Sequence, residues 1–313
     1  MTQGGTSHVT ILMAVRNGAS YLPEQLQSFA AQTHRNWHLI VSDDGSTDDS
    51  RAIIKAFGEQ GHAVTILDGP QQGSAANFLS LVLRMPQMVP GPSWIAFSDQ
   101  DDFWKPERLS AGLAALEQVA PDIPALFCSR LMITDAALVP RHISMLRPSP
   151  AGFRNALVQN IAAGSTALFN PAAARLLCEA AQEAGSVVMH DWWAYQLLTG
   201  VGGHVVHDDR ALVYYRQHGQ NFIGSNDTNA ARARRFSMLM RGRFRAWMDM
   251  NVAALSRSAH RFTPENRAVL EAFVRMRESR LPLRLWRFGR LGIYRQRRIG
   301  TLVMWLSVLL GRL

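Results

Sequence analysis

The chain has 313 residues, and its 33 Lys and Arg exceed its 24 Asp and Glu, which gives a formal net charge of +9. This length suits one large α/β domain or a medium domain with an appendage, and the ordinary apolar content excludes a disordered or collagen-like chain. The two cysteines exclude a disulfide scaffold and a four-cysteine zinc site, and they are typical of a reducing compartment. No basic segment followed by an apolar run opens the sequence, so no signal peptide is expected.

Short apolar runs alternate with helical patterns along the first part of the chain. Runs without helical periodicity predict strands at residues 9–15, 37–41, 64–67, 94–97 and 125–128. Helices are predicted from Pro23, after Thr47 as N-cap, near residues 75–84 and from Pro106. This alternation predicts an α/β fold in which a mostly parallel sheet is flanked by helices.

Polar residues follow the ends of three predicted strands. They are Arg16 and Asn17 after the first strand, Asp43 and Asp44 at the second, and Asp99, Asp101 and Asp102 after the fourth. Ligands of such sheets bind beyond the carboxyl ends of the strands. Carboxylates that converge there repel one another, so we expect a cation or hydrogen bonds between them. The sequence lacks a G-x-G-x-x-G after the first strand and a P-loop motif, which argues against both of those nucleotide sites.

Asp99 and Asp101 form a D-x-D pair at a strand end. Hard divalent ions such as Mg²⁺ or Mn²⁺ take carboxylate ligands and keep positions open for phosphate oxygens. A D-x-D by itself is equally consistent with a solvated acidic turn. The predicted proximity of Asp43 and Asp44 favours the metal site.

Several strings in this order resemble family 2 glycosyltransferases of the GT-A fold. They are MAVRNG at 13–18, QT at 32–33, SDDGSTD at 42–48, SDQDDFWKP at 98–106 and HDWW at 190–193. Within that family the chain is most similar to bacterial O-antigen and polysaccharide rhamnosyltransferases, for which YRQHGQN at 215–221 is also typical. The resemblance covers about residues 8–225. We therefore expect a GT-A domain over 1–225 and an Arg-rich helical segment over 226–313.

The resemblance implies transfer of a sugar, L-rhamnose from dTDP-L-rhamnose, to a saccharide or lipid-linked saccharide acceptor with inversion. It implies that Asp191 is the general base; the alternative is that Asp191 caps the helix over residues 192–198. The divalent metal is expected at Asp99 and Asp101. His218 is either a third metal ligand or a structural histidine.

The resemblance also implies a nucleotide site at the first two strand ends. Its expected residues are Ala14, Val15, Arg16, Asn17, Asp43, Asp44 and Asp99, with Asp44 favoured for the base. Val15 and Arg16 stand where the family usually has Thr and Tyr, and Arg16 could pair with a diphosphate or with Asp43. Arg216 is expected to contact the diphosphate.

The sugar site is expected at two short segments. Gly164 and Ser165 resemble the loop that lines the donor sugar, although a turn before a strand at 166–169 explains them equally well. Trp192 and Trp193 flank the proposed base. Because adjacent helical residues face different directions, at most one of these indoles should stack on a sugar.

The C-terminal segment differs from the rest in charge. Residues 230–313 hold 19 of the 33 basic residues and only 4 of the 24 acidic ones. Residues 299–311 are uncharged but too short to span a bilayer, which needs roughly 20 apolar residues. Arg with Trp and Leu is typical of an interfacial helix, so residues 281–313 are predicted to contact an anionic membrane surface. The alternative is a helical hairpin packed on the body or on a second subunit.

These observations predict a cytoplasmic enzyme, peripheral at the inner face of the cell membrane, with a homo-oligomer as an open alternative. A nucleotidyl transferase with a similar acidic edge is a second interpretation. A nucleic-acid-binding protein acting through the Arg-rich segment is a third. The acidic body and the absence of a recognisable binding signature in the sequence argue against a nucleic-acid partner.

Overall fold

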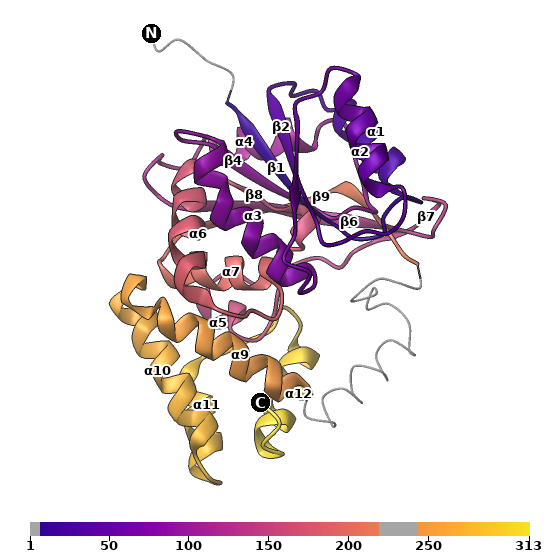
Figure 1. The fold of residues 1–313 in the computed structure, drawn as a ribbon. Coiled ribbons are helices and arrows are strands. Elements are labelled where there is room, and N and C mark those ends of the chain that lie inside the picture. The colour runs from indigo at the N-terminus through magenta and orange to yellow at the C-terminus, as the bar shows by residue number, and fades with distance from the viewer. Residues whose placement is uncertain (1–6, 219–242) are drawn as a thin grey trace.

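The computed structural model describes residues 7–218 and 243–313, and it shows a twisted sheet flanked by helices (Figure 1). The strands are β1 (Val9–Val15), β2 (Trp37–Asp43), β3 (Val64–Asp68), β4 (Trp94–Ser98), β5 (Phe103–Trp104), β6 (Ala125–Thr134), β7 (Pro140–Ile143), β8 (Leu168–Phe169) and β9 (His204–Arg216). They lie in the order β3-β2-β1-β4-β8-β6-β9-β5, and β7 pairs with β6. The pairs among β1 to β4 and the β6–β9 pair are parallel, while β8 runs antiparallel to both of its neighbours. The expected α/β fold is confirmed.

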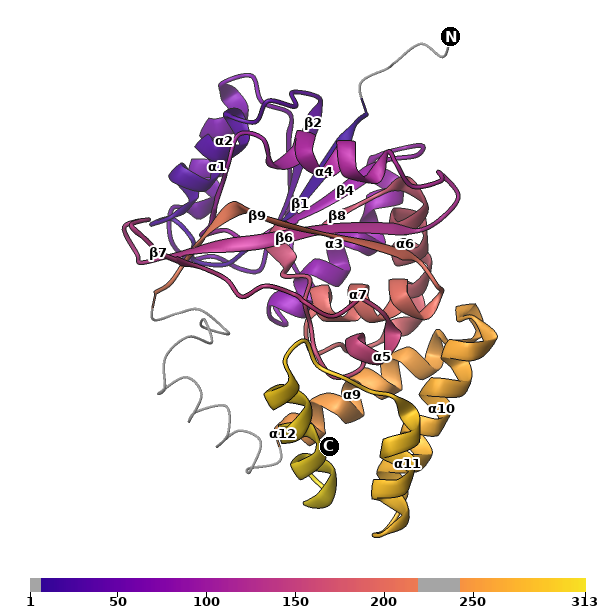
Figure 2. The same cartoon turned by 180° about the vertical axis from the view of Figure 1, so that it is seen from behind.

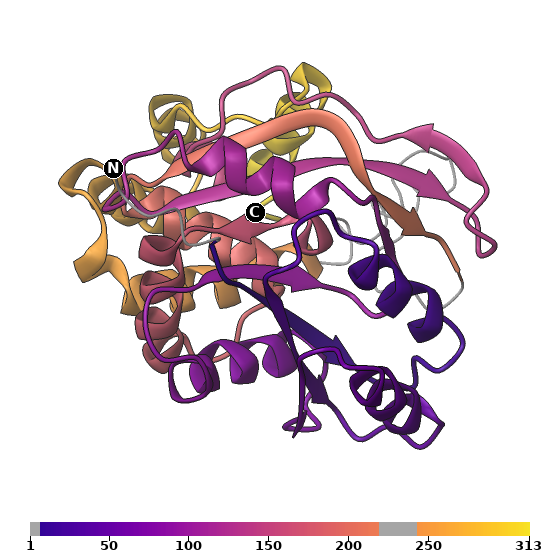
Figure 3. The same ribbon diagram turned by 90° about the horizontal axis from the view of Figure 1, so that it is seen from above.

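The helices cover both faces of this sheet (Figure 3). Those of the body are α1 (Leu22–Ala30), α2 (Ser50–Glu59), α3 (Ser74–Met88), α4 (Arg108–Leu116), α5 (Phe153–Ala156), α6 (Pro171–Ala184) and α7 (His190–Gly200). Ile11 and Met13 of β1 share a buried cluster with residues of α1, α2 and α4, whereas Leu12 belongs to the cluster of α3, α6 and α7. This is the alternation that a strand buried on both faces requires.

The five predicted strands are present as β1, β2, β3, β4 and β6, and helices begin close to the four predicted places. The predicted N-cap is wrong, because α2 begins at Ser50 and is preceded by Asp49. The backbone N–H of Thr47 instead donates to Asn17 Oδ1 at 2.8 Å. Thr47 therefore contacts the loop after β1 instead of capping α2.

The C-terminal helices pack on one another and join the α6–α7 side of the body. They are α9 (Arg243–Arg257), α10 (Pro264–Glu278), α11 (Leu283–Leu291) and α12 (Arg298–Leu309). Helix α9 contacts α6 and α7, and Leu255, Phe273 and Met304 belong to the same core cluster as the body helices. Figures 1 and 2 show α10 to α12 at the end of the molecule remote from α1 and α2. The predicted division at residues 225 and 226 lies outside the described residues.

Candidate active site

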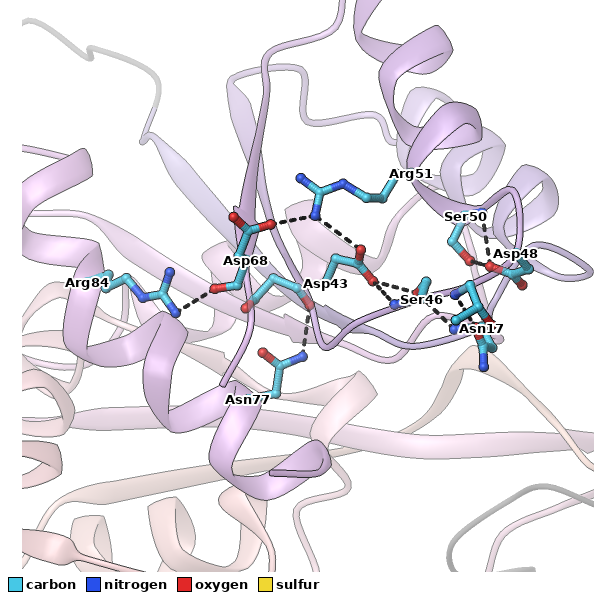
Figure 4. A network of polar contacts seen from close by, with 11 residues as sticks. Asn17, Asp43, Ser46, Asp48, Ser50, Arg51, Asp68, Asn77 and Arg84 are labelled. Carbon is cyan, nitrogen blue, oxygen red and sulfur yellow. Dashed lines mark hydrogen bonds and ion pairs between the residues drawn. The ribbon is translucent and has the colours of Figure 1, made fainter. Parts of the chain in front are cut away.

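The loop after β1 is tied to the loop after β2 by polar contacts (Figure 4). Asn17 has a positive φ of 49°, a conformation that Asn tolerates better than most residues. Its side-chain Oδ1 accepts from the backbone N–H of Thr47, and its own backbone N–H donates to Ser46 Oγ at 2.9 Å. Asp48 Oδ2 accepts from the Ala19 amide at 3.0 Å. Asn17, which is predicted to bind the nucleotide, thus also holds these two loops together at the edge of the sheet.

Asp43 is nearly fully buried at the end of β2. Its Oδ1 accepts from the Ser46 amide at 3.0 Å, and its Oδ2 lies 3.2 Å from the guanidinium of Arg51, which also reaches Asp68 at 2.6 Å. Of the two alternatives for Arg16, pairing with Asp43 is not found, since Arg51 takes that place. The backbone of Arg16 is instead held by the Gln100 amide side chain at 2.8 and 3.1 Å.

Asp44 holds the loop that leads into α3. Its two oxygens accept from the amides of Gln71 at 2.6 Å and Gly73 at 2.9 Å. Beside it, Val15 pairs with Asp43 across the parallel β1 and β2, and Ala14 is only partly buried. The structure brings the predicted nucleotide residues together at one edge, and their contacts to a nucleotide stay a prediction.

The structure places Asp101 against His218, which is 117 residues away in the sequence. His218 Nε2 and Asp101 Oδ2 are 2.8 Å apart, and the imidazole stacks on Tyr21 with ring centroids 4.6 Å apart. Burial, followed by the charges of Asp101 and Asp191, raises the pKa of Asp99 well above its ordinary value. Carboxylates and an imidazole are a donor set that suits Mn²⁺. No group of three or more metal-ligating side chains converges, however, within the residues that the structure describes.

Asp191 lies in the first turn of α7 and faces the turn η1 (Gly164–Thr166). Its Oδ2 accepts from the Gly164 amide at 3.0 Å, and its Oδ1 accepts from the Trp192 amide at 2.7 Å. Burial raises the pKa of Asp191 to about 6, although these hydrogen bonds act in the opposite direction. The residue before the helix is Met189, so the alternative that Asp191 is the N-cap is wrong. The carboxylate is therefore fixed by two hydrogen bonds, and its pKa of about 6 lies close to neutral pH.

His190, the residue before Asp191, is buried against an aromatic side chain. Its ring stacks on Phe78 with centroids 3.6 Å apart, and burial lowers the pKa of His190 to about 3. It is therefore neutral at physiological pH. A Cβ added to Gly164 would lie 2.9 Å from His190 Nε2, so the close approach of the turn to α7 requires glycine there.

We expect Gly164→Ala to lower the melting temperature and the transfer activity together. The added methyl group would push apart the turn and the stacked His190, and it would lengthen the hydrogen bond from the Gly164 amide to Asp191. The matched control is Gly152→Ala, because a Cβ there meets only Tyr294 at 3.7 Å. The free energy of unfolding should fall by about 1–3 kcal/mol for Gly164→Ala, and not for Gly152→Ala. Equal behaviour of the two variants would contradict this account of the turn.

Both predicted sugar-stacking indoles lie in the core. Trp192 is 3% exposed and donates from Nε1 to the Ala156 carbonyl at 2.7 Å, and Trp193 is 1% exposed. At most one of them was expected to stack on a sugar, and the burial of both leaves neither exposed for that contact. Ser165 is also buried, and its carbonyl accepts from Arg108. Gly164 and Ser165 lie in the turn η1 directly before β8, which agrees with the alternative that they form a turn before a strand.

Arg216 is a structural residue of the site rather than a free cation. It is 2% exposed, pairs with Glu24, donates to the Asp101 carbonyl at 2.9 Å, and lies over the Tyr21 ring. This disagrees with the predicted contact to a diphosphate. Arg216 instead fixes the segment that carries Asp101 to the end of β9 and to α1.

Sequence reasoning did not find Arg108. This guanidinium is fully buried, lies 3.4 Å from the centroid of the Trp104 ring, and donates to the carbonyls of Ser165 and Ala167 at 3.0 Å. Burial lowers the pKa of Arg108 to about 9, while the nearby Asp102 opposes that change. Arg108 thereby supports the turn that contacts Asp191. Its only signal in the sequence is an arginine on an otherwise apolar helix face, which usually points to solvent.

The family model described as Glycosyl transferase family 2 matches residues 10–163, which include β1, β2, β4 and the acidic residues that follow these strands. The chain carries a family 2 glycosyltransferase domain. Sequence relatives are glycosyltransferases too: alr2836 of Nostoc sp. is 32% identical over 32% of this chain and 30% of its own length. The dTDP-rhamnosyl transferase RfbG of Shigella flexneri is 23% identical over 72% of this chain and 78% of its own.

A third relative is the UDP-Glc:alpha-D-GlcNAc-diphosphoundecaprenol beta-1,3-glucosyltransferase WfgD of Escherichia coli. It is 27% identical over 34% of this chain and 40% of its own length. The chain thus aligns with less than half of the length of alr2836 and of WfgD.

Solved structures share the GT-A fold of this domain. TarS of S. aureus, solved in complex with UDP-GlcNAc, matches with a TM-score of 0.57 and 12% identity over 91% of this chain and 80% of its own. The mannosyltransferase PcManGT of Pyrobaculum calidifontis, solved with GDP-Man and Mn²⁺, matches with a TM-score of 0.51 and 17% identity over 98% and 86%. At these identities the likeness concerns the fold.

Proposed function

We propose that this chain is an inverting glycosyltransferase that transfers a sugar from a nucleoside diphosphate donor to a saccharide or lipid-linked saccharide acceptor in bacterial polysaccharide synthesis. The observation that carries the proposal is the Asp191 carboxylate, held by two backbone amides and electrostatically coupled to Asp99 of the D-x-D segment. A carboxyl whose pKa is about 6 is ionised at neutral pH and still basic enough to take a proton.

In the proposed reaction, Asp191 takes the proton of the acceptor hydroxyl as its oxygen attacks the anomeric carbon. The bond between that carbon and the diphosphate oxygen breaks, and its electron pair leaves with the diphosphate. A single displacement of this kind inverts the anomeric configuration. His190 and Phe78 are buried and stack on each other beside the Gly164 turn, whose amide donates to Asp191.

The proposed cofactor is a divalent metal, Mg²⁺ or Mn²⁺, held by Asp99, Asp101 and His218. Carboxylates and an imidazole suit such an ion chemically, and the 2.8 Å contact between Asp101 and His218 supports this pair as ligands. Within the described residues the three side chains do not converge as a three-ligand site. When bound, the metal would supply positive charge that stabilises the leaving diphosphate. Arg216, which donates to the Asp101 carbonyl, would keep Asp101 in place for this role.

L-Rhamnose from dTDP-L-rhamnose is the proposed donor sugar. The support is the SDQDD, HDWW and YRQH strings together with the alignment to RfbG along 72% of the chain; residues 219–221 of the last motif lie outside the described part. A lipid-linked acceptor is supported by the name of WfgD, and it agrees with a cytoplasmic enzyme peripheral at the membrane. Among the described helices, none has both the length and the apolar content that a membrane crossing requires.

The proposed function is tested by nucleotide binding and product analysis on the full chain. We expect dTDP with Mn²⁺ to raise the melting temperature by about 5 °C at saturating ligand, and EDTA to remove most of that shift. Incubation with dTDP-L-rhamnose should release dTDP and free or transferred sugar. Release of the sugar 1-phosphate, which leaves when the bond between the two phosphates is broken and the nucleoside monophosphate is transferred, would identify a nucleotidyl transferase instead. A panel of nucleoside diphosphates without any shift would contradict the proposal.

A further inference from the structure

Helix α12 presents an uncharged apolar face to solvent. Ile299 is 73% exposed, Leu302 66% and Leu309 45%, and Val303, Leu306 and Leu310 are exposed on the same side at spacings of three and four residues. The opposite side of the helix, with Met304 and Val308, is buried in the core. Packing on the body therefore accounts for one apolar stripe of α12 and leaves the other in water, which usually marks an interaction site.

Helix α11 extends this surface. Trp286 is 55% exposed and Leu283 44%, and they lie three residues apart on one side of the helix. Trp305 joins the two helices, because its ring packs edge-on against Phe288 with centroids 4.8 Å apart while 38% of it stays exposed. We call the exposed apolar side chains of both helices the α11–α12 face. Figures 1 and 2 show both helices at one end of the molecule.

The segment that carries this face has charges of a single sign. Residues 279–313 contain eight arginines and no aspartate, glutamate or lysine. Arg298 begins α12 and Arg312 follows it, so an exposed arginine lies near each end of the apolar stripe. The Arg290 guanidinium lies 4.1 Å from the centroid of the Trp286 ring. An apolar stripe with Trp and flanking arginines matches a bilayer interface, where acyl chains lie beneath anionic headgroups.

We propose that the α11–α12 face docks on the surface of an anionic lipid bilayer, with its Leu, Ile and Trp side chains at the headgroup–acyl boundary and its arginines on lipid phosphates. A second copy of the chain fits less well, because a two-fold interface would bring these arginines against one another with no acidic residue of the segment between them. The inference deepens the membrane part of the proposed function, and its test uses lipid binding alone, without sugar transfer.

The experiment is co-sedimentation of the full chain with vesicles of phosphatidylcholine, with and without 30% phosphatidylglycerol. We expect binding to the anionic vesicles, weak binding to pure phosphatidylcholine, and a marked loss of binding at high salt. Vesicles with brominated acyl chains should quench tryptophan emission. The quenching should fall strongly in Trp286→Phe combined with Trp305→Phe, since Trp37, Trp104, Trp192 and Trp193 are buried. Trp94 and Trp247, which are partly buried, account for the quenching that remains.

Paired variants separate the apolar and the charged contributions. Leu302→Gln with Leu306→Gln should weaken binding at least about tenfold. Arg290→Gln with Arg298→Gln should weaken binding to anionic vesicles about 30-fold. The matched control is Leu83→Gln with Val139→Gln, two residues of similar exposure on α3 and before β7, which should bind like the unaltered chain. Melting temperatures verify that every variant is folded.

Three results would overturn the inference. The first is equal sedimentation of the leucine variant and the unaltered chain. The second is a stable dimer in analytical ultracentrifugation that the leucine variant loses while vesicles bind neither protein, which would assign the face to a second copy. The third is tight binding of a random DNA duplex that depends on Arg290 and Arg298 but not on the leucines. Vesicle binding without detectable sugar transfer would leave the inference standing and count against the reaction alone.

Discussion

Asp191→Asn is expected to lower kcat for sugar transfer by at least about a thousandfold and to leave nucleotide binding nearly unchanged. The amide is close in shape to the carboxylate but cannot take the proton of the acceptor hydroxyl. Asp191 accepts hydrogen bonds from the backbone amides of Gly164 and Trp192. It is not among the residues predicted to bind the nucleotide, so nucleotide affinity should not depend on its charge. Steady-state kinetics with the donor, together with the melting-temperature shift on adding dTDP, measures both effects.

Stability gives a second readout for the same substitution. Because burial raises the pKa of Asp191 from 3.8 to about 6, the unfolded chain loses this proton more readily, and ionisation destabilises the fold as pH rises from about 4 to 6. Above pH 6 this cost is fully present, on the order of 3 kcal/mol, and the asparagine variant does not carry it. The variant leaves one of two backbone amides without its acceptor, which costs about 1–3 kcal/mol. The two effects roughly offset, so the melting temperature at pH 8 should change by a few degrees at most.

The pH profile of the unaltered enzyme follows from the same pKa. A general base must be ionised, so kcat should increase with pH through about 6 and then level. Asp209→Asn, a change at an exposed carboxylate, is the control and should keep the full profile. If Asp191→Asn lost nucleotide binding and folding stability as strongly as activity, the residue would be structural.

Arg108→Met is expected to cost about 3–5 kcal/mol of folding stability. Methionine has a similar length but cannot donate to the Ser165 and Ala167 carbonyls, which lie 3.0 Å from the guanidinium. It also removes a guanidinium whose pKa is affected by the charge of the nearby buried Asp102. Buried groups that lose their partner pay the desolvation cost in full.

Urea unfolding measures this loss directly, since the midpoint falls while the slope should stay constant. Arg210→Met is the matched control: Arg210 pairs with Asp208 at 2.6 Å but is 62% exposed, so its change should be less than about 1 kcal/mol. Because Arg108 holds the turn that contacts Asp191, any folded Arg108→Met protein should also show a lower kcat. Unchanged stability of this variant would mean that the turn is held by other contacts.

The order of strands and helices in the first half of the chain could be predicted from the sequence alone. Residues 9–15 and 37–41 are short apolar runs that only a buried strand explains, and Pro23 marks the start of a helix. The position of the acidic residues at the strand ends could be predicted in the same way. Acidic residues directly after a strand lie at its carboxyl end, and parallel strands bring those ends to one edge.

What each side chain does at that edge depended on the tertiary structure. The sequence does not tell that Arg51 rather than Arg16 pairs with Asp43, or that Arg216 is buried against Glu24, because these partners come from distant segments. It likewise suggested that one of the indoles at 192 and 193 is free, whereas α7 is enclosed on every side. Strand β9 was missed because its charged first half has no apolar periodicity.

The sequence by itself determined the α/β class, the acidic rim and the contrast between an acidic body and an Arg-rich C-terminal segment, since these depend on local pattern and on composition. Only the tertiary structure decided which of those charges are paired and which apolar side chains of α12 stay in water. The reason is physical: a side chain's pKa, burial and partner are set by neighbours far away in the chain, and local periodicity carries no information about them.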